Sequence, residues 1–131
     1  MCQSLYLRVL NIGKGEIKME LYGYAGKIIH VDLTTRKVTE KALDTELARD
    51  FIGDYGISAR LAYDFIKPGI DPLSPENVIL IGAGPLTGTS APGSGRVHCL
   101  TKLPLNGTIG WGGGGQGFGS RLKYAGYDNL V

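Results

Sequence analysis

Cysteine is scarce in this sequence of 131 residues, which contains only Cys2 and Cys99. Two thiols so far apart indicate neither a disulfide framework nor a metal site built from clustered cysteines. They are also too few to hold an iron–sulfur cluster, which takes four thiolates. We therefore expect a reducing, cytoplasmic location.

Long apolar runs are also missing. No stretch approaches the roughly 18–20 residues that cross a membrane, and residues 1–20 lack the apolar core of a signal peptide. The net charge of +2 is too small to indicate binding to nucleic acid. Because 43% of the residues are hydrophobic and 20% are charged, the composition predicts one globular domain. Neither nucleic acid nor a membrane is an expected partner.

Acidic residues are absent between Glu76 and Asp128. The stretch 77–119 also contains 13 of the 21 glycines, including four in a row at Gly112–Gly115. Glycine lets backbone N–H groups approach a ligand closely, and successive free N–H groups form concave sites for anions. This combination is typical of loops around a phosphate-bearing cofactor. Tight turns and β-bulges are the alternative interpretation of the same glycines.

The remaining pattern predicts an α+β fold rich in β structure. Alternating apolar residues predict one hairpin around Gly13-Lys14-Gly15 and a second over residues 26–43, with its turn near Thr34-Thr35. A helix over residues 45–66, capped by Asp44 and broken at Gly53, is expected to pack on a mixed sheet. Further strands are expected within residues 77–84, 96–103 and 107–111. We interpret His30 and His98 as packed strand residues, not as ligands.

The last eleven residues, RLKYAGYDNLV, predict a helix or turn followed by a strand over residues 129–131. A strand that starts so late in the sequence is expected to have little to pair with. The expected organisation is therefore an N-terminal extension over residues 1–20, with a hairpin in it, and a domain over residues 21–131 that is cut before its end.

Four motifs carry a resemblance to a known family: GPLTGT (84–89), APGSGR (91–96), TKLPLNG (101–107) and LKYAGYD (122–128). Together they resemble the N-terminal domain of tungsten-dependent aldehyde:ferredoxin oxidoreductases. The earlier segments GYAGKIIHVDLTTRKV, LARDFIGDYG and IDPLSPENVIL follow the order and spacing of that family. The resemblance covers roughly residues 22–131. The expected fold is therefore an incomplete N-terminal pterin-binding domain of this family.

The resemblance implies a particular cofactor. Family members hold tungsten, sometimes molybdenum, between two pyranopterins whose phosphates are joined through magnesium, on a largely β base. By resemblance, Arg96 would contact both pterins, and a glycine-rich loop at Gly113–Gly119 would lie against the cofactor. Catalytic residues and metal ligands are not expected in this chain. The residues expected to bind the cofactor are Gly95, Arg96, Lys102, Gly113, Gly114, Gly115 and Gln116.

Two departures from the family pattern affect what the resemblance implies. Where the family typically has Asn-Ser-Gly-Gly-Tyr-Phe-Gly, this chain has Gly-Gly-Gly-Gln-Gly-Phe-Gly at residues 113–119. Backbone contacts to a pterin therefore remain available there, whereas the Asn and Tyr side chains are missing. Tyr55 stands where many members have Arg, which is consistent with a sub-branch that uses another substrate.

The resemblance also implies an activity for the intact enzyme. Family members oxidise an aldehyde to a carboxylic acid and pass the electrons through a [4Fe–4S] cluster to ferredoxin. In the family, the cluster cysteines, the second pterin loop and the substrate pocket lie beyond the part that this chain matches. We therefore predict a cofactor-binding domain that is not catalytic alone.

Two other functions are weighed against this prediction. The main alternative is a non-catalytic truncated remnant that forms a homo-oligomer, such as a dimer, or docks with a subunit or the remaining enzyme domains. A nucleotide-binding loop at GAGPLTG is disfavoured, because the glycines do not form G-x-G-x-x-G and Pro85 lacks the N–H that such a loop needs.

Overall fold

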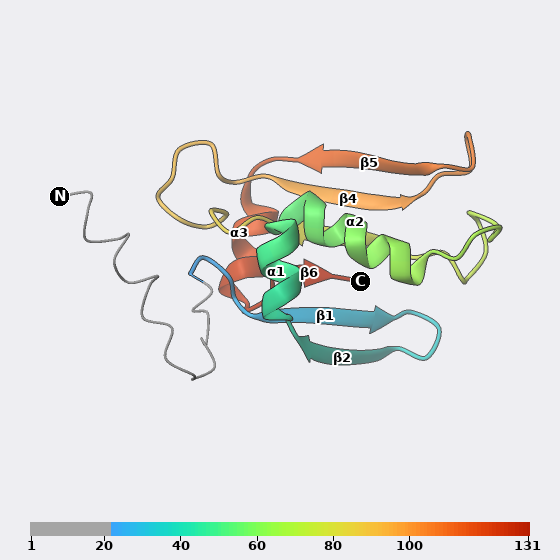
Figure 1. The fold of residues 1–131 in the computed structure, drawn as a ribbon, viewed down its shortest axis with the longest axis horizontal. Coiled ribbons are helices and arrows are strands. Elements are labelled where there is room, and N and C mark those ends of the chain that lie inside the picture. Colours follow the sequence, from blue (N-terminus) through green and yellow to red (C-terminus); the bar gives the residue numbers. More distant parts are fainter. Residues whose placement is uncertain (1–21) are drawn as a thin grey trace.

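The computed structural model describes residues 22–131, which form a six-stranded mixed sheet with three helices (Figure 1). The strands lie in the order β2-β1-β6-β3-β4-β5. The predicted α+β fold is confirmed. The N-terminal extension and the hairpin expected around Gly13-Lys14-Gly15 lie outside the described residues. The strands are β1 (Lys27–Asp32), β2 (Lys37–Ala42), β3 (Leu80–Ala83), β4 (Val97–Lys102), β5 (Ile109–Gly114) and β6 (Asn129–Leu130).

The predicted hairpin over residues 26–43 is formed by β1 and β2, which pair in antiparallel register. Asp32 closes its turn, because Oδ1 accepts hydrogen bonds from the backbone N–H groups of Thr34 and Thr35 at 2.8 and 3.0 Å. Such side-chain contacts to the following backbone stabilise tight turns. The turn at Thr34-Thr35 is therefore confirmed.

The predicted helix is present and is broken at the predicted place. Helix α1 (Thr45–Phe51) begins after Asp44, whose side chain accepts a hydrogen bond from the Glu46 N–H group at 2.9 Å. Helix α2 (Asp54–Phe65) follows at once. Ile52, Gly53 and Asp54, at the junction, have φ angles of 56°, 90° and 45°, so the right-handed helix cannot run through them.

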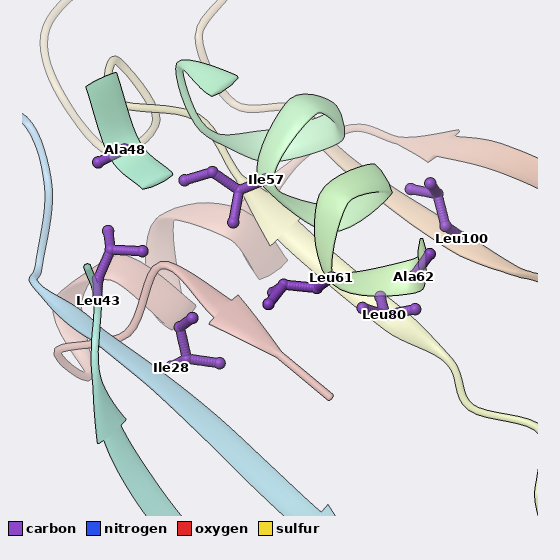
Figure 2. Packing of buried hydrophobic residues seen from close by; sticks show 8 residues of the cluster. All are labelled: Ile28, Leu43, Ala48, Ile57, Leu61, Ala62, Leu80 and Leu100. Carbon is purple, nitrogen blue, oxygen red and sulfur yellow. The ribbon is translucent and has the colours of Figure 1, made fainter. Parts of the chain in front are cut away.

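The main core lies between α1, α2 and one face of the sheet. Ile57 and Leu61 on α2 pack with Leu80 and Leu100 on neighbouring strands (Figure 2). Helix α3 (Gly117–Tyr124) packs on the opposite face, where Leu122 joins Ala83 and Val97. Strand side chains alternate between faces, which explains why Leu80 and Ala83 belong to different clusters. None of the helices within residues 22–131 has the length and hydrophobicity that a membrane crossing requires.

The expectation that the last strand has little to pair with is wrong. Strand β6 lies inside the sheet, parallel to β1 and antiparallel to β3. Beyond β6, Val131 exchanges backbone hydrogen bonds with β1, donating to Ile29 at 2.9 Å and accepting from Val31 at 2.8 Å. The partners of β6 are strands far away in the sequence, so the local pattern could not reveal the pairing.

Candidate functional site

The glycine-rich segment expected as one loop is divided among three kinds of backbone structure. Gly113 and Gly114 end strand β5, where they pair with His98 and Val97 of β4. Gly115 and Gln116 form the connection, and Gly117 opens helix α3. Among the strands of the described residues, β5 lies at the edge of the sheet, so its outward backbone groups face no neighbouring strand there.

The start of α3 is open to an anion. Gln116 precedes the helix with φ 70°, no side chain from residues 22–131 caps the first turn, and that turn contains no acidic residue. The first N–H groups of a helix have no partner within it, and the helix dipole favours negative charge there. Arg121 adds a cation at this end, because its Nε lies 3.6 Å from the position that a Cβ at Gly117 would take.

Gly95 and Arg96 lie beside this segment. The Arg96 side chain is exposed, and its Cδ lies 3.7 Å from the position that a Cβ at Gly113 would take. A Cβ at Gly95 would lie 3.3 Å from the carbonyl oxygen of Gln116. The structure therefore brings together six of the seven residues predicted to bind a cofactor: Gly95, Arg96, Gly113, Gly114, Gly115 and Gln116.

Lys102, the seventh predicted residue, lies apart from the others. It ends β4, six residues after Arg96, which corresponds to about 20 Å along an extended strand. Its Nζ donates a hydrogen bond to the carbonyl oxygen of Ile70 at 2.7 Å. Lys123 also has a partner already, since its ammonium group forms a buried ion pair with Asp128. Arg96 and Arg121, in contrast to Lys123, form no ion pair within residues 22–131.

A hydrogen-bonded pair that the sequence did not predict lies next to Arg96. His98 Nδ1 is 2.6 Å from Oδ2 of Asp54, the first residue of α2, while Asp54 Oδ1 accepts the His98 backbone N–H at 3.1 Å. The interpretation of His98 as a packed strand residue fits its largely buried ring but misses this partner. One signal was available: residues two apart on a strand face the same way, so His98 shares the side of Arg96.

His30 agrees with its interpretation as a packed strand residue. Its ring meets the edge of Phe65 at a centroid distance of 5.5 Å. Burial lowers the pKa of His30, and the nearby positive charge of Lys41 lowers it further. In the described part of the chain, no group of three or more His, Cys, Asp or Glu side chains could hold a metal ion.

The donors gathered at this end of β4 and β5 determine what the site can bind. Arg96, Arg121 and the free N–H groups at the start of α3 are all hydrogen-bond donors or positive charges, while the nearby Asp54 carboxylate is bonded to His98. These groups fit a phosphate-bearing ligand and do not fit a directly bound metal ion. A shallow groove of about 280 Å³ between α2 and strands β4 and β5 has no charged lining residue, so it does not suit such a ligand.

A comparison with models of protein families identifies the family of the chain. Residues 28–131 match the model described as the N-terminal domain of aldehyde ferredoxin oxidoreductase. The chain belongs to the aldehyde ferredoxin oxidoreductase family. The resemblance inferred from the sequence motifs is therefore confirmed.

Curated members of the family show how close the relationship is. The chain is 46% identical over 111 residues to the tungsten-containing aldehyde ferredoxin oxidoreductase of Pyrococcus furiosus, and 41% identical to that of Thermococcus kodakarensis. It is 36% identical over 115 residues to the WOR-like subunit of an aliphatic sulfonate oxidoreductase of Pyrococcus furiosus. Each match covers 85% of this chain but only 18% of the relative's length.

A solved structure supports the family fold of this aldehyde ferredoxin oxidoreductase domain. The chain resembles the active-site complex BamBC of benzoyl coenzyme A reductase, with a TM-score of 0.81 and 33% sequence identity. The similarity covers 83% of this chain and 17% of the solved chain. The chain is therefore similar to proteins whose names describe different substrates.

Proposed function

We propose that this chain is the cofactor-binding base for a tungsten or molybdenum bis-pyranopterin in an aldehyde ferredoxin oxidoreductase-type enzyme. The observation that supports the proposal is that Arg96, Gly113–Gln116 and the uncapped start of α3 all lie at one end of β4 and β5. The names of the tungsten-containing relatives agree with it.

Each group at the site would have a distinct part in binding. The Arg96 guanidinium, exposed and without an ion pair in residues 22–131, would bind phosphate oxygens in a two-pronged manner. The first N–H groups of α3 would donate to the same or a neighbouring phosphate, and Arg121 would add positive charge. When bound, the cofactor supplies the redox centre for aldehyde oxidation, while this chain binds and orients it. Magnesium between the phosphates, the [4Fe–4S] cluster and ferredoxin as partner are expected of the whole enzyme.

The test is cofactor content. The chain would be purified from its native host, alone or with any larger subunit that stays bound, and analysed for tungsten, molybdenum and pterin. We expect stoichiometric metal and pterin in the wild type and loss of both in Arg96→Ala. The matched control is Arg60→Ala, because Arg60 lies on α2 and pairs with Asp64. Wild-type protein without metal or pterin would refute the proposal.

A second proposed function is docking to the remainder of the enzyme. Ile29, Leu130 and Ile81 are neighbours across β1, β6 and β3, and all three are only half-buried. They lie on the face opposite α2, because Asn129, the neighbour of Leu130, points its amide to Ser58 of that helix. Ile79, just before β3, is 58% exposed. Since the chain spans 18% of the length of its relatives, we propose that this surface packs against the rest of such an enzyme.

Co-purification tests the docking proposal. The wild-type chain is expected to retain a larger subunit during purification from its host, and Ile79→Glu is expected to lose that subunit because a charge would be buried. Tyr63→Glu is the control, since Tyr63 is 84% exposed on α2. A wild-type chain that purifies as a homodimer would instead support self-association, and a lone monomer would contradict both.

A further inference from the structure

We propose that Asp54 fixes His98 in the tautomer protonated at Nδ1, and that His98 Nε2 is a further binding atom for the phosphate-type anion held by Arg96. In this proposal Nε2 takes up a proton from solvent when the anion binds. The inference rests on the proposed function in one respect, since it assumes that an anion binds beside Arg96.

The two oxygens of Asp54 hold both the backbone and the ring of His98. Oδ1 accepts the His98 backbone N–H at 3.1 Å, and Oδ2 lies 2.6 Å from Nδ1. An ionised carboxylate can only accept hydrogen bonds, so Nδ1 must carry a proton. The exposed fractions of the His98 and Asp54 side chains are 18% and 21%, so solvent competes poorly for this contact.

The rest of the ring is held between aromatic neighbours. Tyr55 of α2 and Trp111 of β5 meet the His98 ring edge to face, with centroid distances of 6.2 and 5.5 Å. These contacts and the bond to Asp54 fix the plane of the ring. Nε2 therefore has a defined direction, which is the arrangement by which proteins orient an imidazole toward a ligand.

Nε2 faces the same glycine as Arg96 does. A Cβ at Gly113 would lie 3.3 Å from His98 Nε2 and 3.7 Å from Arg96 Cδ. The two side chains thus converge over the bare backbone of Gly113, and a side chain there would press against the ring. No hydrogen bond within residues 22–131 ends on His98 Nε2.

The charges around the ring determine how it responds to an anion. From α2 it is faced by the Asp54 carboxylate and the Tyr55 phenol, and from just before its own strand by Arg96, whereas β5 contributes only Trp111 and glycine. A neutral Nε2 presents a lone pair, which repels an anion. A protonated Nε2 donates a charge-assisted hydrogen bond, and Asp54 balances the resulting imidazolium. Anion binding at this position therefore favours uptake of one proton.

The tautomer is tested first, by ¹⁵N NMR of the imidazole nitrogens in the complete chain. The chain has two histidines, so His30 serves as the internal reference. We expect His98 to carry its proton on Nδ1 in the wild type. In Asp54→Asn the amide NH₂ group faces Nδ1, so the proton should move to Nε2. Asn also tolerates the positive φ of this position. An Nε2-protonated His98 in the wild type would overturn the proposal.

Proton uptake is tested with sulfate, a tetrahedral anion that does not itself titrate between pH 6 and 8. If Nε2 takes up a proton together with the anion, the affinity for sulfate should be roughly three- to tenfold higher at pH 6 than at pH 8. His98→Gln should remove this pH dependence, while His30→Gln should keep it. A pH dependence that survives in His98→Gln would overturn the role of Nε2.

Failure of this inference can be told apart from failure of the proposed function. If Arg96→Ala weakens sulfate binding but neither His98→Gln nor pH changes it, the anion site stands and the role of His98 is wrong. If sulfate does not bind to the wild type at all, the anion site itself is refuted, and the role of Nε2 with it.

Discussion

Asp128 accepts a hydrogen bond at 2.7 Å from the backbone N–H of Gly26, a residue 102 positions earlier in the chain. Its other oxygen accepts from the Ala25 N–H at 2.9 Å and from the ammonium group of Lys123. The Asp128 side chain is 1% exposed and that of Lys123 is 8% exposed. A buried carboxylate is tolerated only when its acceptor sites are satisfied in this way. The contact fixes the start of β1 against the residue that precedes β6.

Replacing Asp128 with Asn should destabilise the fold. The amide cannot balance the buried charge of Lys123, and its NH₂ group would face a donor. Removing one partner of a buried ion pair typically costs about 3–5 kcal/mol. Urea unfolding of Asp128→Asn should show a loss near the lower end of that range. Asp50→Asn is the control, because the Arg49–Asp50 pair is more than half exposed and should change stability little. Equal effects of the two substitutions would contradict the structural role of Asp128.

The same substitution to Ala should change the stability of the fold differently at two glycines. A Cβ at Gly82 would lie 2.5 Å from Ser58 Oγ and 2.6 Å from the Asp54 carbonyl oxygen, so α2 would have to move away from the sheet. We expect Gly82→Ala to cost about 1–3 kcal/mol, the usual range for overpacking. At Gly112 nothing lies within 4 Å of the Cβ position, so Gly112→Ala should be neutral or slightly stabilising. Thermal unfolding of both variants measures the difference, and an unaffected Gly82→Ala would show that α2 packs less closely than described.

His30 should make the fold less stable in mild acid. Burial, and then the charge of Lys41, lower its pKa in the folded state below the usual 6.5. The unfolded chain therefore binds the proton more readily, and stability contributed by the neutral ring is lost as the pH falls below about 6.5. Urea unfolding at pH 7.5 and pH 5.0 should show a smaller loss for His30→Gln than for the wild type. The carboxyl groups whose pKa is lowered, Asp32 and Glu40, titrate below this window. An identical loss in both proteins would mean that other groups cause the acid sensitivity.

Local sequence signals were sufficient for part of the fold. The turn after Asp32, the cap at Asp44 and the break at Gly53 each depend on a few adjacent residues, and all three appear where the sequence placed them. The family motifs were also reliable, because they are long and lie in the expected order.

Contacts between distant residues could not be predicted in the same way. The position of β6 between β1 and β3 depends on the tertiary arrangement of the whole sheet. The contact between Asp54 and His98 joins residues 44 positions apart on a helix and a strand. Lys102 was grouped with the cofactor residues because the surrounding sequence is free of acids. It lies, however, at the other end of β4 from Arg96. The cofactor roles of Arg96 and the glycine-rich segment stay predictions.

Because Lys102 lies apart from the other predicted residues, its substitution should affect sulfate binding less than that of Arg121. Arg121 lies in the last turn of α3, but its side chain reaches back to Gly117 at the start of the helix, and it has no ion pair within residues 22–131. The Lys102 ammonium, in contrast, is already bound to the Ile70 carbonyl oxygen. Loss of the Arg121 charge should weaken sulfate binding by roughly three- to tenfold, because charge-assisted hydrogen bonds are the stronger ones. Lys102→Met should leave sulfate affinity unchanged and instead cost about 1 kcal/mol of stability through the lost hydrogen bond.

Amide NMR titrations with sulfate, followed at Gly115–Gly119, measure both affinities on the complete chain. Urea unfolding of the same samples separates a folding defect from a binding defect. If Lys102→Met weakened sulfate binding as much as Arg121→Ala, the anion would have to lie along β4 and not at the start of α3. If Arg121→Ala alone weakens it, the binding groups are those that the fold gathers at the end of β5, and the lysine stabilises the loop that precedes β3.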